Sequence, residues 1–141
     1  MPTFERTVTV DRPVAEVFAY LSDFTNTEEW DAGTVRTVRT EGDGGVGTVY
    51  LNTSKFLGRE VVVEYVVQRL VPGKVFALRG ENSSTVAHDT MTFREVDGGT
   101  LVTYTATFDF KGVLKLVAPL TRPMFNKLFD DGARGIKQAL R

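Results

Sequence analysis

The residues of this chain that could do chemistry are few, and the densest group of them lies early in the sequence. Four acids, Asp23, Glu28, Glu29 and Asp31, surround Trp30, the only tryptophan. Carboxylates this close together could form a catalytic pair, but acids also favour the first turn of a helix. Because capping-type residues precede Glu28 and Glu29, we expect these two to be helix-start charges. The role of Asp31 stays open, since it follows the helical segment and could lie at the rim of a cavity.

Nucleophilic and metal-dependent catalysis have no visible residue set. The chain has no cysteine, which excludes thiol catalysis and thiolate metal sites, and His88 is its only histidine. Ser83, Ser84 and Thr85 lie in or beside a turn without a partnered His–Asp pair. Because no group of acids has the spacing of a calcium loop, we expect no metal site and no cofactor.

The stretch GDGGVG, residues 42–47, has the glycine spacing of a dinucleotide-binding loop. That motif needs a helix directly after it, so that the helix amides meet the pyrophosphate. The strand-like TVYLNTS follows here instead. We therefore interpret the stretch as a turn in which glycines adopt positive φ.

Composition restricts the class of protein further. A chain of 141 residues with 42% apolar content fits one domain spanning 1–141. Its 17 basic and 18 acidic residues nearly cancel, so we expect neither nucleic acid nor an anionic membrane as partner. No run approaches the roughly 20 apolar residues of a membrane span, and the first ten residues lack the apolar core of a signal peptide. We expect a soluble, cytoplasmic protein, monomeric or homodimeric.

Hydrophobic periodicity predicts the elements that position these residues. Residues 3–10 alternate like a strand, and Asp11 and Pro13 then favour a helix start. A short amphipathic helix follows, with apolar residues at helical spacing: Val14, Val17, Phe18 and Leu21. Residues 22–30 add one or two further helical turns. Strand patterns separated by short turns rich in glycine or other turn residues occupy 34–40, 47–54, 59–70, 74–80, 84–96 and 100–110, and a helix of about 19 residues closes the chain within 121–141.

This order of elements resembles the helix-grip fold of the START and Bet v 1-like (SRPBCC) superfamily, and most closely the bacterial polyketide cyclase/dehydrase and lipid-transport-like proteins. The resemblance rests on DRPVAEVFAYLSDFTNTEEW, the turn EGDGGVGT, EYVVQRLVPGKVFAL, FREVDGGTLVTYTATF and the closing helix. It implies an α+β fold in which about seven curved antiparallel strands wrap the long helix, with two short helices after the first strand. It also implies a cavity between sheet and helix, with Trp30 near the entrance.

The last hairpin supplies the inner face of that sheet. A two-residue Gly98-Gly99 loop would place four pairs opposite each other: Phe93 with Tyr104, Met91 with Ala106, Asp89 with Phe108, and Ala87 with Phe110. The opposite face carries His88 and several threonines, which is typical of a solvent-facing side. The position of His88 in its strand therefore places its side chain on the outer face, and we expect no catalytic role for it. Tyr65 should face inward with Val61, Val63 and Val67.

We therefore expect a hydrophobic small molecule to contact nine residues: Trp30, Tyr65, Asp89, Met91, Phe93, Tyr104, Phe108, Phe125 and Leu128. Asp89 and Tyr104 are the catalytic candidates, because an inward carboxylate among aromatics should have a raised pKa. Two alternatives stay open: Asp89 could sit hydrated at the open end of its strand, and the tyrosines could be ordinary core residues. Gly132 and Gly135 indicate close packing, ligand room or a local helix break.

Three functions fit these observations. The first is a carrier or sensor that binds a lipid, polyketide or isoprenoid. The second is a cofactor-free polyketide cyclase, aromatase or dehydratase that uses one or two acid-base groups of the cavity. The third is a chaperone-associated or other protein-interaction module, which would require an exposed apolar patch. The threonine-rich outer face offers no such patch.

Overall fold

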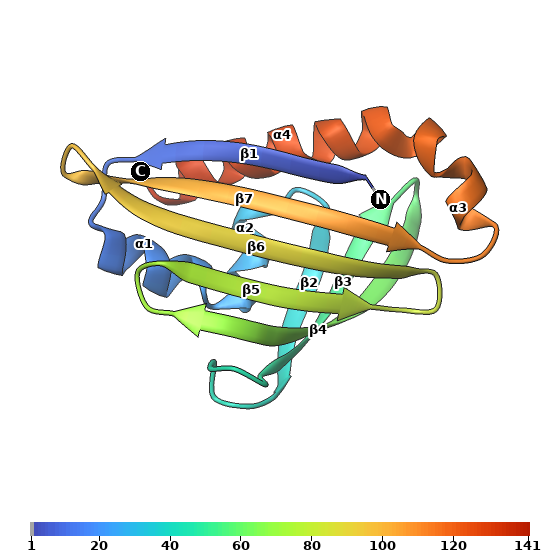
Figure 1. Cartoon of the computed structure of the whole chain (residues 1–141), viewed down its shortest axis with the longest axis horizontal. Coiled ribbons are helices and arrows are strands. Elements are labelled where there is room, and N and C mark those ends of the chain that lie inside the picture. Colours follow the sequence, from blue (N-terminus) through green and yellow to red (C-terminus); the bar gives the residue numbers. More distant parts are fainter. Residues whose placement is uncertain (1) are drawn as a thin grey trace.

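A curved antiparallel sheet folds around a long C-terminal helix in the computed structural model, which describes residues 2–141 (Figure 1). The sheet consists of seven strands: β1 (Thr3–Val10), β2 (Thr34–Glu41), β3 (Val49–Phe56), β4 (Arg59–Val71), β5 (Val75–Glu81), β6 (Thr85–Val96) and β7 (Gly99–Phe110). The helices are α1 (Val14–Leu21), η1 (Phe24–Asn26), α2 (Thr27–Trp30), α3 (Leu114–Val117), η2 (Ala118–Thr121) and α4 (Arg122–Ala139). This matches the predicted order, with η1 and α2 together forming the second short helical segment, except that the two short helices α3 and η2 before α4 were not predicted.

Strand order explains how the sheet encloses a core. The order is β1-β7-β6-β5-β4-β3-β2, and every neighbouring pair is antiparallel. Only β1 and β7 are paired without being consecutive in the chain. In Figure 1, β2 and β3 run across the direction of β5, β6 and β7, so the sheet is strongly bent. α4 packs along β1 and also contacts α2, which places it across the concave face.

The β6–β7 hairpin turns one residue earlier than the sequence prediction. Val96 pairs with Gly99, so the loop is Asp97-Gly98, with φ of 45° and 80°. The predicted Gly98-Gly99 loop is therefore wrong, and the true pairs are Phe93 with Val102, Met91 with Tyr104, Asp89 with Ala106, and Ala87 with Phe108. Asp-Gly is a favoured two-residue turn with positive φ at both positions. When the loop moves by one residue, the partner of each β6 residue moves by two positions along β7. Every side chain therefore keeps its predicted face.

The second glycine of that predicted loop has a different role. A Cβ on Gly99 would lie 2.5 Å from the carbonyl oxygen of Val10. Gly99 is thus required where the end of β1 approaches β7, and its bare Cα permits that contact. The turn at 42–47 does use its glycines as predicted, since Gly42, Gly44 and Gly47 have φ of 89°, 106° and 90° before β3 begins.

Two helix starts differ in how they are capped. The predicted Asp11 cap is wrong, because α1 begins at Val14 with Pro13 as N-cap and no side-chain cap bond. The Pro13 carbonyl instead accepts the amides of Glu16 and Val17 at 3.1 Å each. Asp23 does cap η1, accepting the Thr25 amide at 3.1 Å.

α4 runs without a break through both of its glycines. A Cβ on Gly135 would lie 1.9 Å from the Trp30 carbonyl oxygen, whereas a Cβ on Gly132 would lie 3.7 Å from the Trp30 ring. The contact between α2 and α4 is therefore a close backbone approach at Gly135. The structure supports the close-packing interpretation and contradicts a local break.

Two hydrophobic clusters fill the space between sheet and helices. The larger one joins α1, the middle of the sheet and the C-terminal half of α4, and includes Phe18, Trp30, Phe76, Phe93 and Ile136. The smaller one consists of Phe4, Ala106 and Phe129, with Phe108 and Phe125 at its edge. Tyr104 packs against both clusters. It therefore marks the boundary between the main core and an aromatic region near the start of α4.

Candidate functional site

An apolar cleft of about 480 Å³ opens where the start of α4 faces β1 and β7. Its lining comes from three parts of the chain: Pro2 and Phe4; Phe108, Asp109 and Phe110; and Lys115, Ala118, Pro119, Arg122 and Phe125. The Arg122 guanidinium carbon lies 5.0 Å from the centre of the Phe4 ring. Cationic groups favour the face of an aromatic ring, and this contact holds Arg122 against Phe4 in the lining of the cleft.

Aromatic rings continue from this cleft into the protein. Phe125 is central, with ring centroids 4.7 Å from Phe56, 4.9 Å from Phe108, 5.6 Å from Phe4 and 6.0 Å from Phe110. Deeper in, Phe4 stacks on Phe129 at 5.3 Å, Phe129 lies 5.4 Å from Tyr104, and Tyr104 meets Trp30 edge to face at 5.8 Å. A continuous aromatic wall therefore links the cleft to the interior.

At the inner end of this wall lies a polar cluster, defined by Asp31, Tyr65, Asp89 and Tyr104. The Tyr104 hydroxyl donates to Oδ2 of Asp89 at 3.1 Å. Within residues 2–141, Oδ1 of Asp89 is buried and has no hydrogen-bond partner. Buried polar atoms are nearly always paired, so an orphaned carboxylate oxygen indicates a site for a ligand or water. Asp89 is only 5% exposed, which contradicts the alternative of a hydrated strand end.

Burial controls the charge of this cluster. Loss of solvation raises the pKa of Asp89 from 3.8 to about 7, the Tyr104 hydrogen bond lowers it in part, and the Asp31 charge raises it again. Burial likewise raises the pKa of Asp31, against hydrogen bonds from Thr34 and Gly33 that lower it. The pKa values of Tyr65 and Tyr104 are raised by burial and by both carboxylates. Asp89 can therefore exchange a proton near neutral pH, while both tyrosines stay neutral donors.

Asp31 reaches the interior through a buried polar network that sequence reasoning missed. Thr34 donates to Oδ2 of Asp31 at 2.7 Å, and the Asn52 amide donates to the hydroxyls of Thr34 and Thr37 at 3.1 and 2.8 Å. Asn52 is buried and opposes Val63 on the inner face of the sheet. The sequence did contain one sign of this network: Asn52 carries an amide side chain at a position where its apolar strand faces inward. This network fixes the Asp31 carboxylate, and the Asp31 side chain stays half-buried at the edge of the interior.

Trp30 lies between α2 and α4, not at the mouth of the apolar cleft. Its side chain is 3% exposed, and its Nε1 has no hydrogen-bond partner within the described chain. It borders a second, polar cleft of about 350 Å³ with Glu28, Glu29, Asp31, Asp131 and Arg134 among its lining residues. Glu28 and Glu29 belong to the first turn of α2 and accept from the Thr37 amide and the Tyr20 hydroxyl at 2.9 and 2.6 Å. These bonds agree with structural roles for the two acids.

The remaining predicted residues divide between cleft and core. Phe108 and Phe125 line the apolar cleft. Met91 and Phe93 are core residues, and Phe93 meets Phe18 at 5.0 Å on the α1 side. Leu128 is half-buried and approaches Gly33 at the start of β2. His88 is exposed on the outer face, as its strand phase predicted.

Among residues 2–141 no three His, Cys, Asp or Glu side chains come together in a way that could hold a metal ion. None of the helices within that range is long and apolar enough to cross a membrane. What the site offers chemically is an apolar cleft, an aromatic wall and one carboxyl–phenol pair at the inner end.

A bent antiparallel sheet closed over a long helix is the helix-grip fold of the Bet v 1 and START superfamily. The chain belongs to the family described as polyketide cyclase/dehydrase and lipid transport, whose sequence profile matches residues 1–141. No protein with a curated function matches the chain.

Solved structures of distant relatives share this fold. The protein TTHA0849 from Thermus thermophilus is 13% identical with a TM-score of 0.81, covering 99% of this chain and 97% of that one. The Zhui aromatase/cyclase from Streptomyces sp. R1128 is 17% identical with a TM-score of 0.79, covering 99% and 90%. A START superfamily protein from Mycobacterium smegmatis is 14% identical with a TM-score of 0.78, covering 98% and 96%. At these identities the likeness concerns the fold.

Proposed function

We propose that this protein binds a hydrophobic small molecule of the lipid, polyketide or isoprenoid type between the sheet and α4, as a carrier or sensor. The ligand enters by the apolar cleft, displaces the Phe125 ring and extends along the aromatic wall. Its polar end meets the inner cluster. The absence of cysteine suits a reducing cytoplasm, where we place the protein.

The observation that carries this proposal is the orphaned Oδ1 of Asp89 at the inner end of an aromatic wall. An apolar pocket with a few convergent polar groups is the usual form of a small-molecule site. Asp89 supplies one acceptor, or one donor when it is protonated. The unpartnered Nε1 of Trp30 supplies a second donor next to Tyr104. Together they would orient a ligand hydroxyl or carbonyl, while the aromatic rings select for apolar bulk.

Filling the apolar cleft should weaken ligand binding. Ala118 lines this cleft and Ala32 lines the polar one, so Ala118→Phe and Ala32→Phe form a matched pair. We expect Ala118→Phe to weaken binding of the fluorescent apolar probe 8-anilinonaphthalene-1-sulfonate by about tenfold or more, a loss of ~1.4 kcal/mol. Ala32→Phe should bind like the wild type. Fluorescence titration gives both affinities.

Native mass spectrometry of protein from its own host then identifies the natural ligand. A co-purifying apolar molecule that is lost from Ala118→Phe would support the proposal. Equal probe affinity in both variants would remove the apolar cleft from the binding path. If the wild type neither carries such a molecule nor binds the probe, and a panel of lipids and polyphenols leaves its melting temperature unchanged, the carrier function fails.

A second candidate function is a cofactor-free cyclase, aromatase or dehydratase, and the Asp89–Tyr104 pair favours it. A carboxyl group with a pKa of about 7 is poised for general acid-base catalysis at neutral pH. In this role Asp89 would move the proton and Tyr104 would position the carboxyl. Turnover of a polyketide-type substrate, lost in Asp89→Asn, would favour the enzyme over the carrier.

The coupling of this pair can be measured without a substrate. Because the Tyr104 hydrogen bond lowers the pKa of Asp89, Tyr104→Phe should raise that pKa above about 7. Titration followed by carbon NMR of labelled aspartate reports the shift. Tyr20→Phe removes a phenol that is bonded to Glu29 instead and should leave the Asp89 titration unchanged. An unshifted titration in Tyr104→Phe would show that the phenol does not control the carboxyl.

A further inference from the structure

An exposed apolar segment lies directly beside the apolar cleft. Residues 113–124, here called the apolar prong, comprise Val113, α3, η2 and the start of α4. Val113, Leu116 and Leu120 are 83%, 81% and 79% exposed, and Val117 and Met124 are also exposed. Side chains of this kind are normally covered, so five of them on one segment indicate a binding surface.

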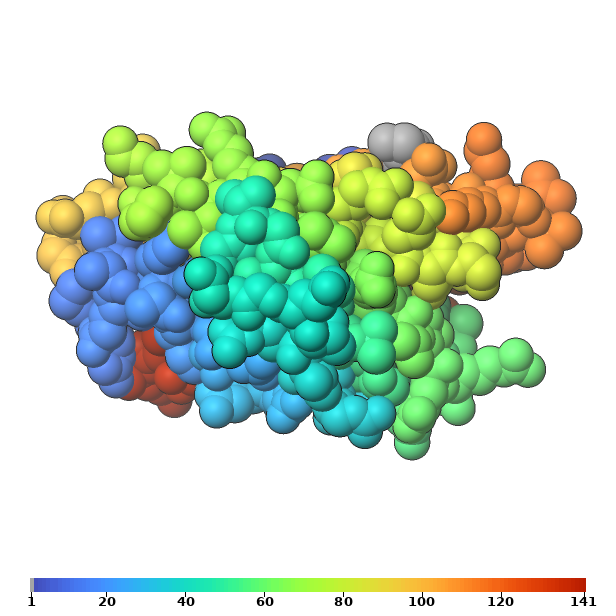
Figure 2. Space-filling view, turned by 90° about the horizontal axis from the view of Figure 1, so that it is seen from below, coloured from blue at the N-terminus to red at the C-terminus, as the bar shows by residue number. Residues whose placement is uncertain are grey.

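A second exposed apolar side chain, that of Leu57, lies at the same end of the molecule as the prong. Leu57 stands at the turn between β3 and β4 with φ of 58° and is exposed. The neighbouring Phe56 stacks on Phe125 at 4.7 Å, which ties this hairpin to the start of α4. Figures 1 and 2 both place α3 and the β3–β4 hairpin at one end of the protein. The apolar cleft opens beside them, since Lys115, Ala118 and Phe125 line it.

Basic residues surround these apolar tips. Lys115 and Arg122 belong to the prong, and within residues 2–141 neither forms an ion pair with a carboxylate. Lys55 and Arg59 flank Leu57 and are exposed. The acids near this end are Glu60, which lies opposite Lys55, Glu64, which lies opposite Glu81, and Asp109. Two more basic residues, Arg79 and Lys111, pair with Glu81. Basic groups therefore outnumber acids here, although the whole chain carries a net charge of −1.

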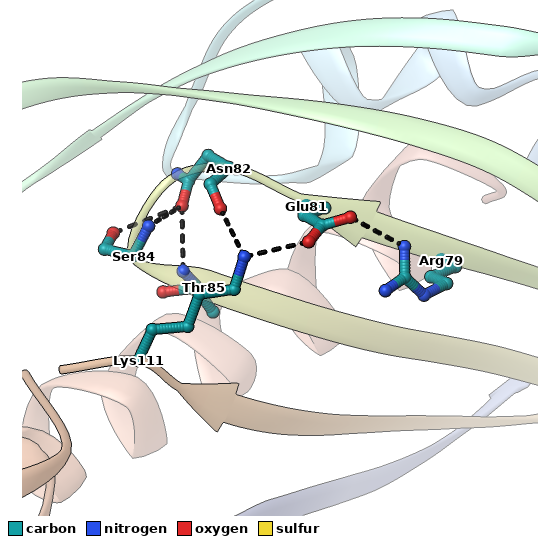
Figure 3. A network of polar contacts seen from close by, with 6 residues as sticks. All are labelled: Arg79, Glu81, Asn82, Ser84, Thr85 and Lys111. Atoms are coloured by element: carbon teal, nitrogen blue, oxygen red, sulfur yellow. Dashed lines mark hydrogen bonds and ion pairs between the residues drawn. The ribbon is translucent and has the colours of Figure 1, made fainter.

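The base of the prong is firmly held. Lys111 donates to Glu81 at 2.8 Å and to the Asn82 carbonyl at 3.1 Å, and Glu81 also pairs with Arg79 (Figure 3). The Asn82 side chain accepts the amides of Ser84 and Thr85 at 2.9 Å each. These bonds fasten the end of β7 to the β5–β6 turn, so the prong projects from a fixed base.

We propose that this end of the molecule docks on an anionic lipid bilayer, with the apolar prong and Leu57 inserted among the acyl chains. Apolar tips backed by Lys and Arg are the combination that holds a protein at a charged bilayer surface. A stable protein partner would need roughly 20–30 residues on each side, whereas the prong is one short convex segment. The docked orientation would turn the cleft mouth toward the lipid. The sequence favoured no membrane partner because it revealed only the overall charge balance.

Vesicle sedimentation tests the proposal without any bound ligand. We expect the protein to pellet with vesicles of 70% phosphatidylcholine and 30% phosphatidylserine, and roughly tenfold less with pure phosphatidylcholine. The double variant Leu116→Asp/Leu120→Asp should lose at least about tenfold in partitioning to the anionic vesicles. Val46→Asp is the control, because Val46 is also an exposed apolar residue, is 66% exposed and lies in the β2–β3 turn. It should pellet like the wild type.

The lack of cysteine allows a second readout of insertion. Leu120→Cys and Val46→Cys can each carry one environment-sensitive nitrobenzoxadiazole label. Emission from the label at position 120 should rise and shift to shorter wavelength with the anionic vesicles, while that at position 46 should not change. Unchanged circular dichroism of all variants confirms that they remain folded.

Three results would overturn the proposal. The first is no sedimentation with either vesicle type. The second is sedimentation that the double variant leaves intact. The third is a dimer by light scattering that Leu116→Asp/Leu120→Asp converts to a monomer, which would assign the prong to a second copy of the chain. Binding of the apolar probe in vesicle-free buffer is a separate measurement, so failure of docking and failure of ligand binding are distinguishable.

Discussion

Gly135→Ala should lower the free energy of unfolding by about 3 kcal/mol or more, the largest loss that we expect from adding one methyl group to this protein. The new Cβ would lie 1.9 Å from the carbonyl oxygen of Trp30 and 2.8 Å from its carbonyl carbon. Both are backbone atoms and cannot rotate away, so α2 and α4 would have to separate. Urea unfolding measures the loss, and fluorescence of Trp30 reports on the contact itself.

Gly132→Ala is the matched control, one turn earlier on the same helix. Its Cβ would lie 3.7 Å from Cζ3 of Trp30, an ordinary van der Waals distance. Because alanine is the better helix former, this variant should gain about 0.5–1 kcal/mol in stability. Equal losses in both variants would show that glycine flexibility, not the Trp30 contact, accounts for the two residues. Unchanged stability in Gly135→Ala would mean that the helices are not in close contact.

Most of the fold was predictable because the sequence contains strong local signals. Apolar strand patterns bounded by glycine or other turn residues predicted every strand, and a helical period predicted α4. The β6–β7 register was not predictable from Gly98 and Gly99 alone. Gly99 is needed by the neighbouring β1, which ends against it at Val10. A glycine that looks like a turn residue can therefore belong to a long-range contact.

The site was only partly predictable, because strand phase identifies which face a residue occupies but not what fills that face. Phase alone placed Asp89, Tyr104 and Tyr65 inside. It could not separate Phe93, which packs under α1, from Phe108, which lines the cleft. The Asp31 network depends on hydroxyl and amide groups from α2, β2 and β3, which meet only when the sheet bends.

Asp89→Asn should stabilise the protein at pH 8 by up to about 4 kcal/mol and leave it nearly unchanged at pH 4. The folded-state pKa of Asp89 is about 7, whereas an unfolded aspartate has a pKa near ~3.9. Between these values the unfolded chain has released the proton and the folded protein still holds it. Unfolding then releases a proton, so the free energy of unfolding falls as pH rises from about 4 to 7. Above that window both states are ionised and the difference is constant.

The measurement is urea unfolding of both proteins at intervals from pH 4 to 8. The curve for each protein includes other carboxylates, such as Asp31, whose raised pKa acts in the same direction, and Glu81, whose lowered pKa acts below this window. Subtracting the two curves removes most of these shared contributions. At pH 4 the neutral Asp89 and the asparagine are both uncharged, so near-equal stability there serves as the internal control.

The pH dependence of this stability difference also shows how well the surroundings of Asp89 solvate its carboxylate. A rise toward pH 8 means that ionised Asp89 sits in a dry interior without enough partners, as its unpaired Oδ1 indicates. A ligand hydroxyl or ammonium group that pairs with this oxygen would then recover part of the lost stability, and ligand affinity should increase with pH. A flat difference would mean that water already solvates the carboxylate. The inner cluster would then be wet, and its orphaned oxygen would no longer support a ligand anchor.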